Sequence, residues 1–338
     1  MRVLHIAYQQ LRRYGHTRVS WAQKLFFGLI KNGHYVQGFS DRDVAAFEAP
    51  LGIRDLGYKK ANKRLLEMAE ALQPDLVVVG HCDIIQNRTL EDIRRLLPAV
   101  AIAGCNNDPL FIPDNVRKIE QRCAVVDAMF VSTGHEALKQ FEGRRARLFH
   151  MPNPVDGAIE NQDASNRQNL PIDLIYCSNA LQHTKRLEDV GYLRQQLNGE
   201  LVFKTFGSFG EKPVWGRDYD RALGQSKMGL NFNRQEGWHW YSSARIAQLG
   251  GNGLLIFTNA DAGFDTLFPD RTLVYYRDLD HLLGLIREFH ADDDKRRAWA
   301  AATRHFFHTE MNSTLNAQYI LESTLGIDYS HPYVWLEQ

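Results

Sequence analysis

Residues 74–81, Pro-Asp-Leu-Val-Val-Val-Gly-His, contain the apolar run that decides the fold class. Four consecutive apolar residues after a Pro-Asp turn are typical of a parallel strand that is covered on both faces. A helical pattern precedes this run at residues 61–72, and a second one follows at residues 90–97. Alternation of buried strands with amphipathic helices predicts a doubly wound α/β sheet.

The same alternation extends outward through both halves of the chain. Further strands are expected at residues 3–8, 34–39, 100–103, 128–131, 147–150, 172–177, 201–206, 229–232 and 253–258. Helical patterns lie between them, including residues 116–124, 187–197, 218–227 and 243–249, and residues 279–325 are mainly helical. Residues 157–171 are polar, have no apolar period and are the best linker.

Two successive α/β units predict two Rossmann-like domains that face each other across a cleft. We expect an N-terminal domain at residues 1–156, the linker at 157–171 and a C-terminal domain at 172–305. The helical tail at 306–338 should pack back on the N-terminal domain. Ligands of such sheets bind beyond the carboxyl ends of the strands, so the loops there are the places to search.

Composition limits the partners of the chain. Its 338 residues carry 40 Lys+Arg and 40 Asp+Glu, a formal net charge of zero, which leaves no broad attraction for nucleic acid. The start of the chain turns polar too quickly for a signal peptide, and no apolar run approaches the length of a membrane span. We expect a cytoplasmic protein, with peripheral contact with the inner face of the membrane left open. Trp21, Phe26 and Phe27 lie on a helix that either touches lipid or, more simply, faces the core.

Common catalytic motifs are missing. The sequence has no Gly-rich dinucleotide fingerprint, no P-loop, no H-E-x-x-H and no G-x-S-x-G. Asp-x-Asp pairs, which can hold a divalent cation, occur four times, at residues 41/43, 218/220, 278/280 and 292/294, so the spacing is unspecific. We therefore expect neither a metal nor a cofactor.

The segment 215–268 is the most informative for chemistry. Ser242 and Ser243 precede a predicted helix whose first turn contains Arg245. A cation there opposes the helix dipole, whereas an anion bound at the helix start would make it favourable. The alternative is an Arg245 that reaches solvent or pairs with Glu236.

Several segments, taken together, resemble one family. They are Ser226-Lys227, Gly229–Phe232, Arg245, Gly253–Leu255, Leu267-Phe268 and Val274–Tyr276, with Asn107–Pro109 and Asp127–Ser132 in the first half. In order and spacing they resemble CgeB-like (spore-protein-like) glycosyltransferases of the wider GT-B, family-four-like group. The resemblance implies a nucleotide-sugar donor held by the C-terminal domain. It implies a polysaccharide, glycolipid or glycoprotein acceptor held by the N-terminal domain.

The resemblance also implies roles for particular residues. Arg245 occupies the position of the family's arginine near the donor, and Gln248 that of a glutamate that binds ribose. A partner glutamate eight residues upstream would be Trp240, and Glu236 lies four residues further back, so the paired-glutamate motif is absent.

Departure of a nucleoside diphosphate builds negative charge that cations must stabilise when no metal is present. The cations near the expected donor site are Lys185, Arg186, Arg234 and Arg245. The alternative for Lys185-Arg186 is a capped surface helix start. Ser178 and Asn179 follow a strand and could approach the phosphates, and Gly207 after the next strand would allow close approach.

Three residues are candidate general bases for an inverting reaction. They are Asp108, His16 and His81, each in a loop after a predicted strand, and Asp108 is preferred. Asp108 could also be only an Asp-Pro turn residue. Glu236 completes the set of catalytic candidates.

Three functions are compatible with these residues. The first is a metal-independent glycosyltransferase, and the second is a nucleotide-sugar epimerase or hydrolase of the same fold. The third is a non-catalytic subunit that binds sugar nucleotides, which the absent glutamate pair keeps open.

Overall fold

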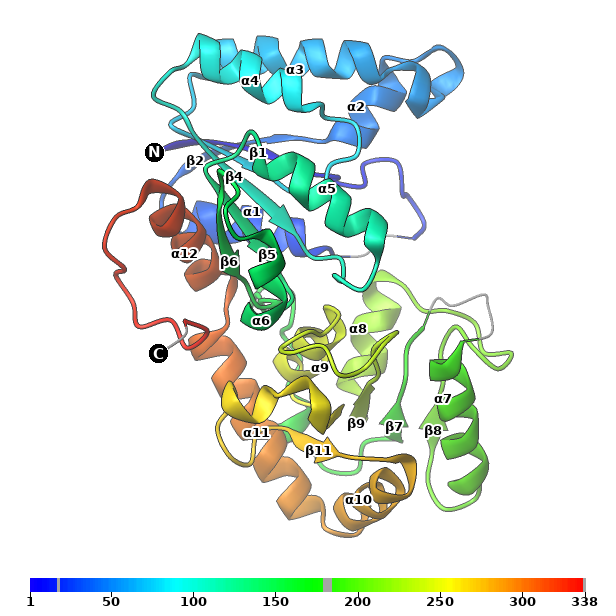
Figure 1. The fold of residues 1–338 in the computed structure, drawn as a ribbon. Coiled ribbons are helices and arrows are strands. Elements are labelled where there is room, and N and C mark those ends of the chain that lie inside the picture. The colour runs from blue at the N-terminus through cyan, green and yellow to red at the C-terminus, as the bar shows by residue number, and fades with distance from the viewer. Residues whose placement is uncertain (17–18, 179–183, 337–338) are drawn as a thin grey trace. The chain divides into compact units, whose positions relative to one another are not determined.

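The computed structural model describes residues 1–16, 19–178 and 184–336, and the chain forms two compact units (Figure 1). Unit 1 comprises Met1–Pro152 and Ser313–Gln338, and unit 2 comprises Asn153–Asn312. The chain thus leaves unit 1 after residue 152, near the expected 156, and returns to it at residue 313. The expected boundary at 305/306 falls inside helix α11 (Asp293–Glu310), which belongs to unit 2.

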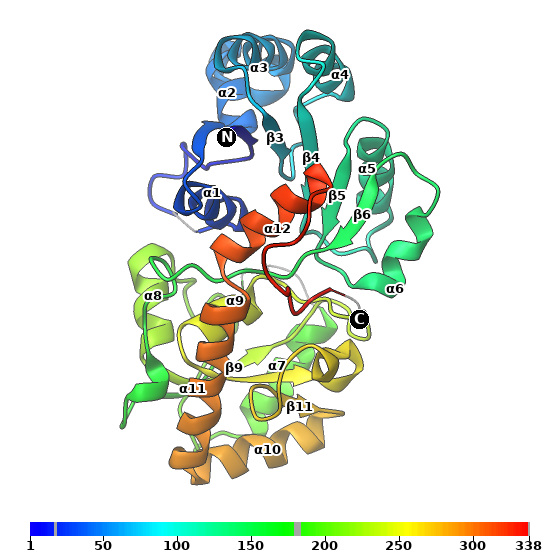
Figure 2. The same ribbon diagram turned by 90° about the vertical axis from the view of Figure 1, so that its left-hand side faces the viewer.

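Unit 1 is built on a six-stranded parallel sheet of order β2-β1-β3-β4-β5-β6. Its strands are β1 (Arg2–Ile6), β2 (Tyr35–Phe39), β3 (Leu76–Val79), β4 (Ala101–Asn106), β5 (Ala128–Val131) and β6 (Arg147–His150). Its helices are α1 (Trp21–Lys31), α2 (Asp41–Phe47), α3 (Tyr58–Leu72), α4 (Asn87–Leu96), α5 (Pro113–Cys123), α6 (His135–Leu138) and α12 (Ser313–Leu325). Helices α1 and α12 cover one face of this sheet, and α3, α4 and α5 cover the other (Figure 2). All of β3 is buried, as its apolar sequence predicted.

The returning helix α12 packs closely on α1. Ser20 caps α1 through a capping box with Gln23, which fixes where the helix begins. Gly28 then faces the start of α12, where an added Cβ would stand 2.0 Å from the carbonyl oxygen of Ser313. A glycine at this place lets the two backbones approach, so α12 completes the core of unit 1.

Unit 2 has a five-stranded parallel sheet of order β11-β10-β9-β7-β8. Its strands are β7 (Ile172–Ile175), β8 (Phe203–Lys204), β9 (Ser226–Asn231), β10 (Leu255–Asn259) and β11 (Val274–Tyr276). Its helices are α7 (Lys185–Gln196), α8 (Gly216–Gly224), α9 (Arg245–Gly251), α10 (Leu279–Ala291) and α11. Helices α7 and α10 bury their apolar side chains against one face, and α9 and α11 pack on each other at the other. The predicted α/β class with two Rossmann-like units is confirmed.

Two local predictions need correction. The polar stretch 157–171 lies within unit 2 and is no linker between the units, because its backbone is bonded to unit 2 through Asn252. The helix expected at 218–227 ends at Gly224, and Ser226 and Lys227 begin β9. In β9, Lys227 Nζ forms an ion pair with Asp173 Oδ1 of the neighbouring strand β7 at 2.8 Å.

The four cysteines, Cys82, Cys105, Cys123 and Cys177, are free thiols. No helix in the described part of the chain is long and apolar enough to cross a membrane.

Candidate functional site

Arg245 stands at the carboxyl ends of two adjacent strands of unit 2. Its Nη1 donates to the carbonyl oxygen of Phe232, just after β9, at 2.8 Å. Its Nη2 donates to that of Cys177, just after β7, at 3.3 Å, and the guanidinium lies 5.1 Å from the ring centre of Tyr176. Among the described carboxylates none forms an ion pair with Arg245, so its charge is held in place without being neutralised.

Arg245 and Arg234 both lie within electrostatic range of Arg186, and we call these three residues the arginine cluster. The pKa of Arg186 is lowered mainly by burial, and the charges of Arg245 and Arg234 lower it further. Its Nε is buried without a hydrogen-bond partner in the described structure. Three like charges at one sheet edge repel one another, and a bound anion would relieve that repulsion.

Glu236 is the acidic neighbour of the arginine cluster. Its carboxylate accepts hydrogen bonds from the backbone N–H of Asn233 at 2.8 Å and from Asn233 Nδ2 at 3.1 Å. Burial raises the pKa of Glu236, while Asn233 and the charge of Arg245 lower it in part. A raised pKa favours the neutral carboxyl group, which reduces how much of the cluster's positive charge Glu236 offsets.

The prediction that a serine hydroxyl caps the helix that begins near Arg245 is wrong. The N-cap residue of α9 is Ala244, which makes no side-chain cap. Ser242 is buried and donates instead to Asn231 Oδ1 at 2.9 Å, and the Ser243 hydroxyl accepts from Arg245 at 3.4 Å. An anion site here therefore rests on guanidinium groups, because α9 has only seven residues and no capped start.

The loops after β7 and β8 are tied together at Gly207. This residue has φ +80°, and an added Cβ would stand 1.8 Å from the carbonyl oxygen of Ser178. The N–H of Ser178 donates to the Phe206 carbonyl at 2.9 Å. Glycine is required for this approach, which brings Ser178 beside the next loop. Asn179 lies outside the described residues.

Lys185 does not join the arginine cluster. Thr184 caps α7, and the exposed Lys185 forms an ion pair with Asp189 one turn along the helix. The alternative of a capped surface helix start therefore describes Lys185, whereas Arg186 faces inward.

Gln248 and Trp240, which occupy the positions of the family's glutamate pair, both form hydrogen bonds within unit 2. Gln248 Oε1 accepts a hydrogen bond from the Tyr219 hydroxyl at 2.9 Å. Trp240 is buried, and its indole N–H donates to the carbonyl of Gly263 and the hydroxyl of Thr266, each at 3.0 Å. Packing of the 231–241 loop thus accounts for a tryptophan at the upstream position.

Unit 1 brings His81 and Asp108 together. His81 Nε2 lies 3.4 Å from Asp83 Oδ1 and 3.6 Å from Asp108 Oδ2. The pKa of His81 is raised, chiefly by its hydrogen bond to Asp83 and also by the charge of Asp108, against an opposing effect of burial. The pKa of Asp83 lies well below its usual range, first because of His81 and then because of Arg42.

Asp108 is also a turn residue, as the alternative proposed. Its N–H donates to Asn106 Oδ1 at 2.9 Å, and its carbonyl accepts from Asn115 Nδ2 at 2.9 Å. The side chain remains about half exposed, at 51%. His16 is exposed in the loop between β1 and α1.

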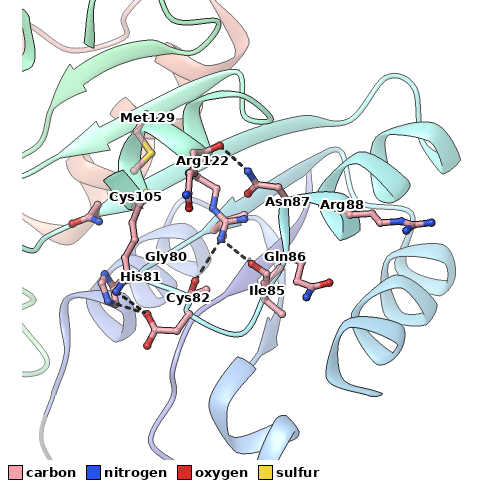
Figure 3. A pocket seen from close by; sticks show the side chains of 15 residues that line it. Gly80, His81, Cys82, Ile85, Gln86, Asn87, Arg88, Cys105, Arg122 and Met129 are labelled. Atoms are coloured by element: carbon pink, nitrogen blue, oxygen red, sulfur yellow. Dashed lines mark hydrogen bonds and ion pairs between the residues drawn. The ribbon is translucent and has the colours of Figure 1, made fainter. Parts of the chain in front are cut away.

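A pocket of about 550 Å³ opens beside His81 in unit 1 (Figure 3). It lies at the ends of β3 and β4. Its walls are residues 79–83 and 85–88, with Cys105, Asn106 and Met129, and Lys118, Gln121 and Arg122 of α5. Sequence reasoning missed these α5 residues because the polar face of an amphipathic helix is expected to face solvent. No pattern in the sequence shows that α5 packs beside the loop after β3.

The Asp-x-Asp pair at residues 41 and 43 is buried rather than solvated. Asp43 accepts from the backbone N–H of Leu11 at 2.9 Å and from Ser40 Oγ at 2.5 Å. In the described residues no three His, Cys, Asp or Glu side chains are placed to hold a metal ion together.

Comparison with known proteins shows which families and solved structures this chain resembles. Residues 180–322 match the family model described as glycosyl transferase-like. HepE of Anabaena, solved with UDP and glucose, is 11% identical with a TM-score of 0.65, over 97% of this chain and all (100%) of that one. Sucrose-phosphate synthase of Thermosynechococcus elongatus is 11% identical with a TM-score of 0.60, over 96% of this chain and 99% of that one.

An enzyme of another class shares the fold as well. A UDP-N-acetylglucosamine 2-epimerase is 13% identical with a TM-score of 0.53, over 96% of both chains. No curated protein matches the sequence. Membership of the CgeB-like subgroup stays a prediction. The chain has the GT-B fold, and its residues 180–322 match a family model of glycosyl transferase-like proteins.

Proposed function

We propose that the protein is a metal-independent glycosyltransferase that uses a nucleoside diphosphate sugar. The arginine cluster of unit 2 binds the diphosphate, and unit 1 binds the acceptor. The observation that carries this proposal is the group of three guanidinium ions at the carboxyl ends of β7 and β9, beside Glu236, whose pKa burial raises. The structure of HepE with UDP supports a uridine nucleotide as the first donor to test.

The cluster supplies what departure of the nucleotide requires. As the bond to the sugar breaks, negative charge grows on the diphosphate oxygens. Arg245 is already fixed by two carbonyl oxygens and the Tyr176 ring, so little reorganisation is needed to meet that charge. Charge-assisted hydrogen bonds from arginine to phosphate are strong enough to replace a metal cation in this role.

His81 and Asp108 are the groups that we propose for activating the acceptor hydroxyl. The half-exposed Asp108 accepts the proton, and His81 links it to Asp83. His16 is a second candidate base. Glu236, with its raised pKa, is a candidate proton donor in unit 2.

The test of this proposal is a titration with UDP, UMP and UDP-glucose in the presence of EDTA, followed by release of UDP from UDP-glucose. Tight binding of UDP and UDP-glucose, weaker binding of UMP, and acceptor-dependent UDP release support the proposal. Indifference to every nucleotide would refute it.

The same measurements separate the alternatives. An epimerase would give an isomerised nucleotide sugar without an acceptor, and a hydrolase would give free sugar. A binding subunit would bind UDP-glucose and leave it intact. The epimerase with the same fold is the reason for including these controls.

We propose that the acceptor is a polysaccharide, glycolipid or glycoprotein, modified in the cytoplasm and in part at the membrane surface. The aromatic side chains of α1 do not favour lipid contact, since Trp21 is buried. Large apolar side chains are exposed instead at the end of α2 and in the segment from there to α3, where Phe47 is 62%, Leu51 95% and Leu56 61% exposed.

Two exposed lysines, Lys59 and Lys60, form no ion pair in the described structure and lie just after this apolar segment. Apolar side chains beside cations fit an anionic bilayer. Flotation with anionic vesicles should recover the wild type and lose Leu51→Ser, while Val202→Ser, an exposed site in unit 2, should behave as wild type. Equal flotation of all three would refute the contact.

A further inference from the structure

The pocket of unit 1 has the size of a small-ligand site. Its volume of about 550 Å³ falls within the range of 300–1,000 Å³ that is usual for such sites. His81 lies at one side and Arg122 lies in its wall (Figure 3). The side chain of Arg88 points away from His81, so Arg88 is given no part in ligand binding.

Arg122 is a largely buried cation without an ion pair in the described structure. Its Nη2 donates to the carbonyl oxygens of Ile85 at 2.9 Å and Cys82 at 3.4 Å (Figure 3). In the described structure its Nη1 is buried without a hydrogen-bond partner, and Arg122 forms no ion pair. Burial raises the pKa of the nearby Asp41 and lowers that of Arg122, which the charge of Asp41 raises in part. Buried charges in proteins are normally paired, so an anion bound in the pocket would give Arg122 the ion pair that it lacks in the described structure.

The remaining charges of the pocket do not supply that anion. Asp83 is bonded to Arg42 and His81, and only its Oδ1 approaches Lys118, at 3.9 Å. Lys118 also pairs with Asp114 at 3.0 Å, and its side chain, 48% exposed, lines the pocket. The pocket therefore has more positive than negative charge on its α5 wall.

We propose that this pocket holds an acceptor sugar that bears a phosphate or a carboxylate. Arg122 and Lys118 bind the anionic group, and a hydroxyl of the same sugar meets His81 and Asp108. This inference names the acceptor class and rests on the proposed glycosyltransferase function. It predicts that charge, more than sugar ring, determines recognition in unit 1.

The test compares glucose 6-phosphate, glucuronate and glucose by calorimetric titration, with and without saturating UDP. The two anionic sugars should bind at least about tenfold more tightly than glucose, since one charge-assisted contact is worth that much. The tighter of the two identifies phosphate or carboxylate. Equal binding of all three, or no binding, would overturn the proposal.

Variants locate the binding in this pocket. Lys118→Gln, at an exposed site that should fold normally, and Arg122→Lys should each weaken the anionic sugars by about tenfold or more. Arg117→Gln on the same helix, where the side chain is 69% exposed and paired with Asp114, is the matched control and should bind as wild type. If the anionic sugars bind Lys118→Gln and Arg122→Lys as tightly as wild type, the pocket is not their site.

The test also separates this inference from the proposed function. UDP binding to unit 2 should be unchanged in Lys118→Gln and Arg122→Lys. If the anionic sugars do not bind while UDP binds normally, only the proposed acceptor class is overturned. If the wild-type protein does not bind UDP, the glycosyltransferase proposal itself is overturned.

Discussion

Replacing Arg186 by methionine should have opposite effects on nucleotide binding and on stability. Methionine keeps much of the apolar stem but removes a charge that Arg245 and Arg234 repel in the free protein. Relief of that repulsion, after solvent screening, is on the order of 1 kcal/mol, which offsets the lost packing. The free variant should therefore unfold at the same temperature as wild type or slightly higher.

Binding of UDP should weaken in the same variant. One charge-assisted contact to phosphate is worth about 1.5–3 kcal/mol, so the Kd should rise by about 10- to 150-fold. At a UDP concentration about 100 times the wild-type Kd, the ligand stabilises wild type by about 2.7 kcal/mol. A 100-fold weaker variant would gain only about 0.4 kcal/mol under the same conditions.

The assay is calorimetric titration with UDP, joined to thermal unfolding with and without UDP. Arg194→Met is the matched control, because Arg194 lies on the same helix and contacts Phe209 rather than the cluster. It should bind UDP as wild type does. A destabilised Arg186→Met with unchanged UDP affinity would show that Arg186 is structural and would refute the reasoning.

Four further outcomes are expected. Asp108→Asn should lower kcat by about 10²- to 10⁴-fold with the UDP affinity retained, and normal turnover would exclude Asp108 as the base. Gly207→Ala should destabilise the protein by about 2–4 kcal/mol in chemical unfolding, because its Cβ meets Ser178, whereas Gly210→Ala, at φ +81° with open space, should cost about 1 kcal/mol. The raised pKa of His81 means that His81 stabilises the fold fully below about pH 6.5 and that this contribution fades as pH rises through the folded-state pKa, so His81→Gln should destabilise more at pH 5.5 than at pH 8.5. EDTA should leave UDP affinity and turnover unchanged, and restoration of lost activity by Mg²⁺ would contradict metal independence.

The fold was predictable where the sequence pattern reports burial directly. The run Leu76–Val79 is apolar throughout because both faces of β3 are covered, and the chain forms a strand there. The end of α8 was misplaced because Ser226 and Lys227 continue a helical pattern. What makes them strand is a partner far along the chain, Asp173, which no local pattern reveals.

The candidate site was predictable in part for the same reason. Arg245 and Arg186 follow strands, so the sequence alone places them at a sheet edge. Ser242 has the right identity for a helix cap, but its hydroxyl is committed to Asn231 of the preceding strand. Arg122 escaped notice because only tertiary packing turns that helical arginine toward the loop after β3.

A crystal structure of the protein with UDP-glucose would test the central claim most directly. The account predicts that the diphosphate oxygens lie within hydrogen-bond distance of Arg186, Arg234 and Arg245 at the ends of β7 and β9. A nucleotide bound elsewhere on the chain, or a diphosphate that touches none of these guanidinium groups, would contradict it.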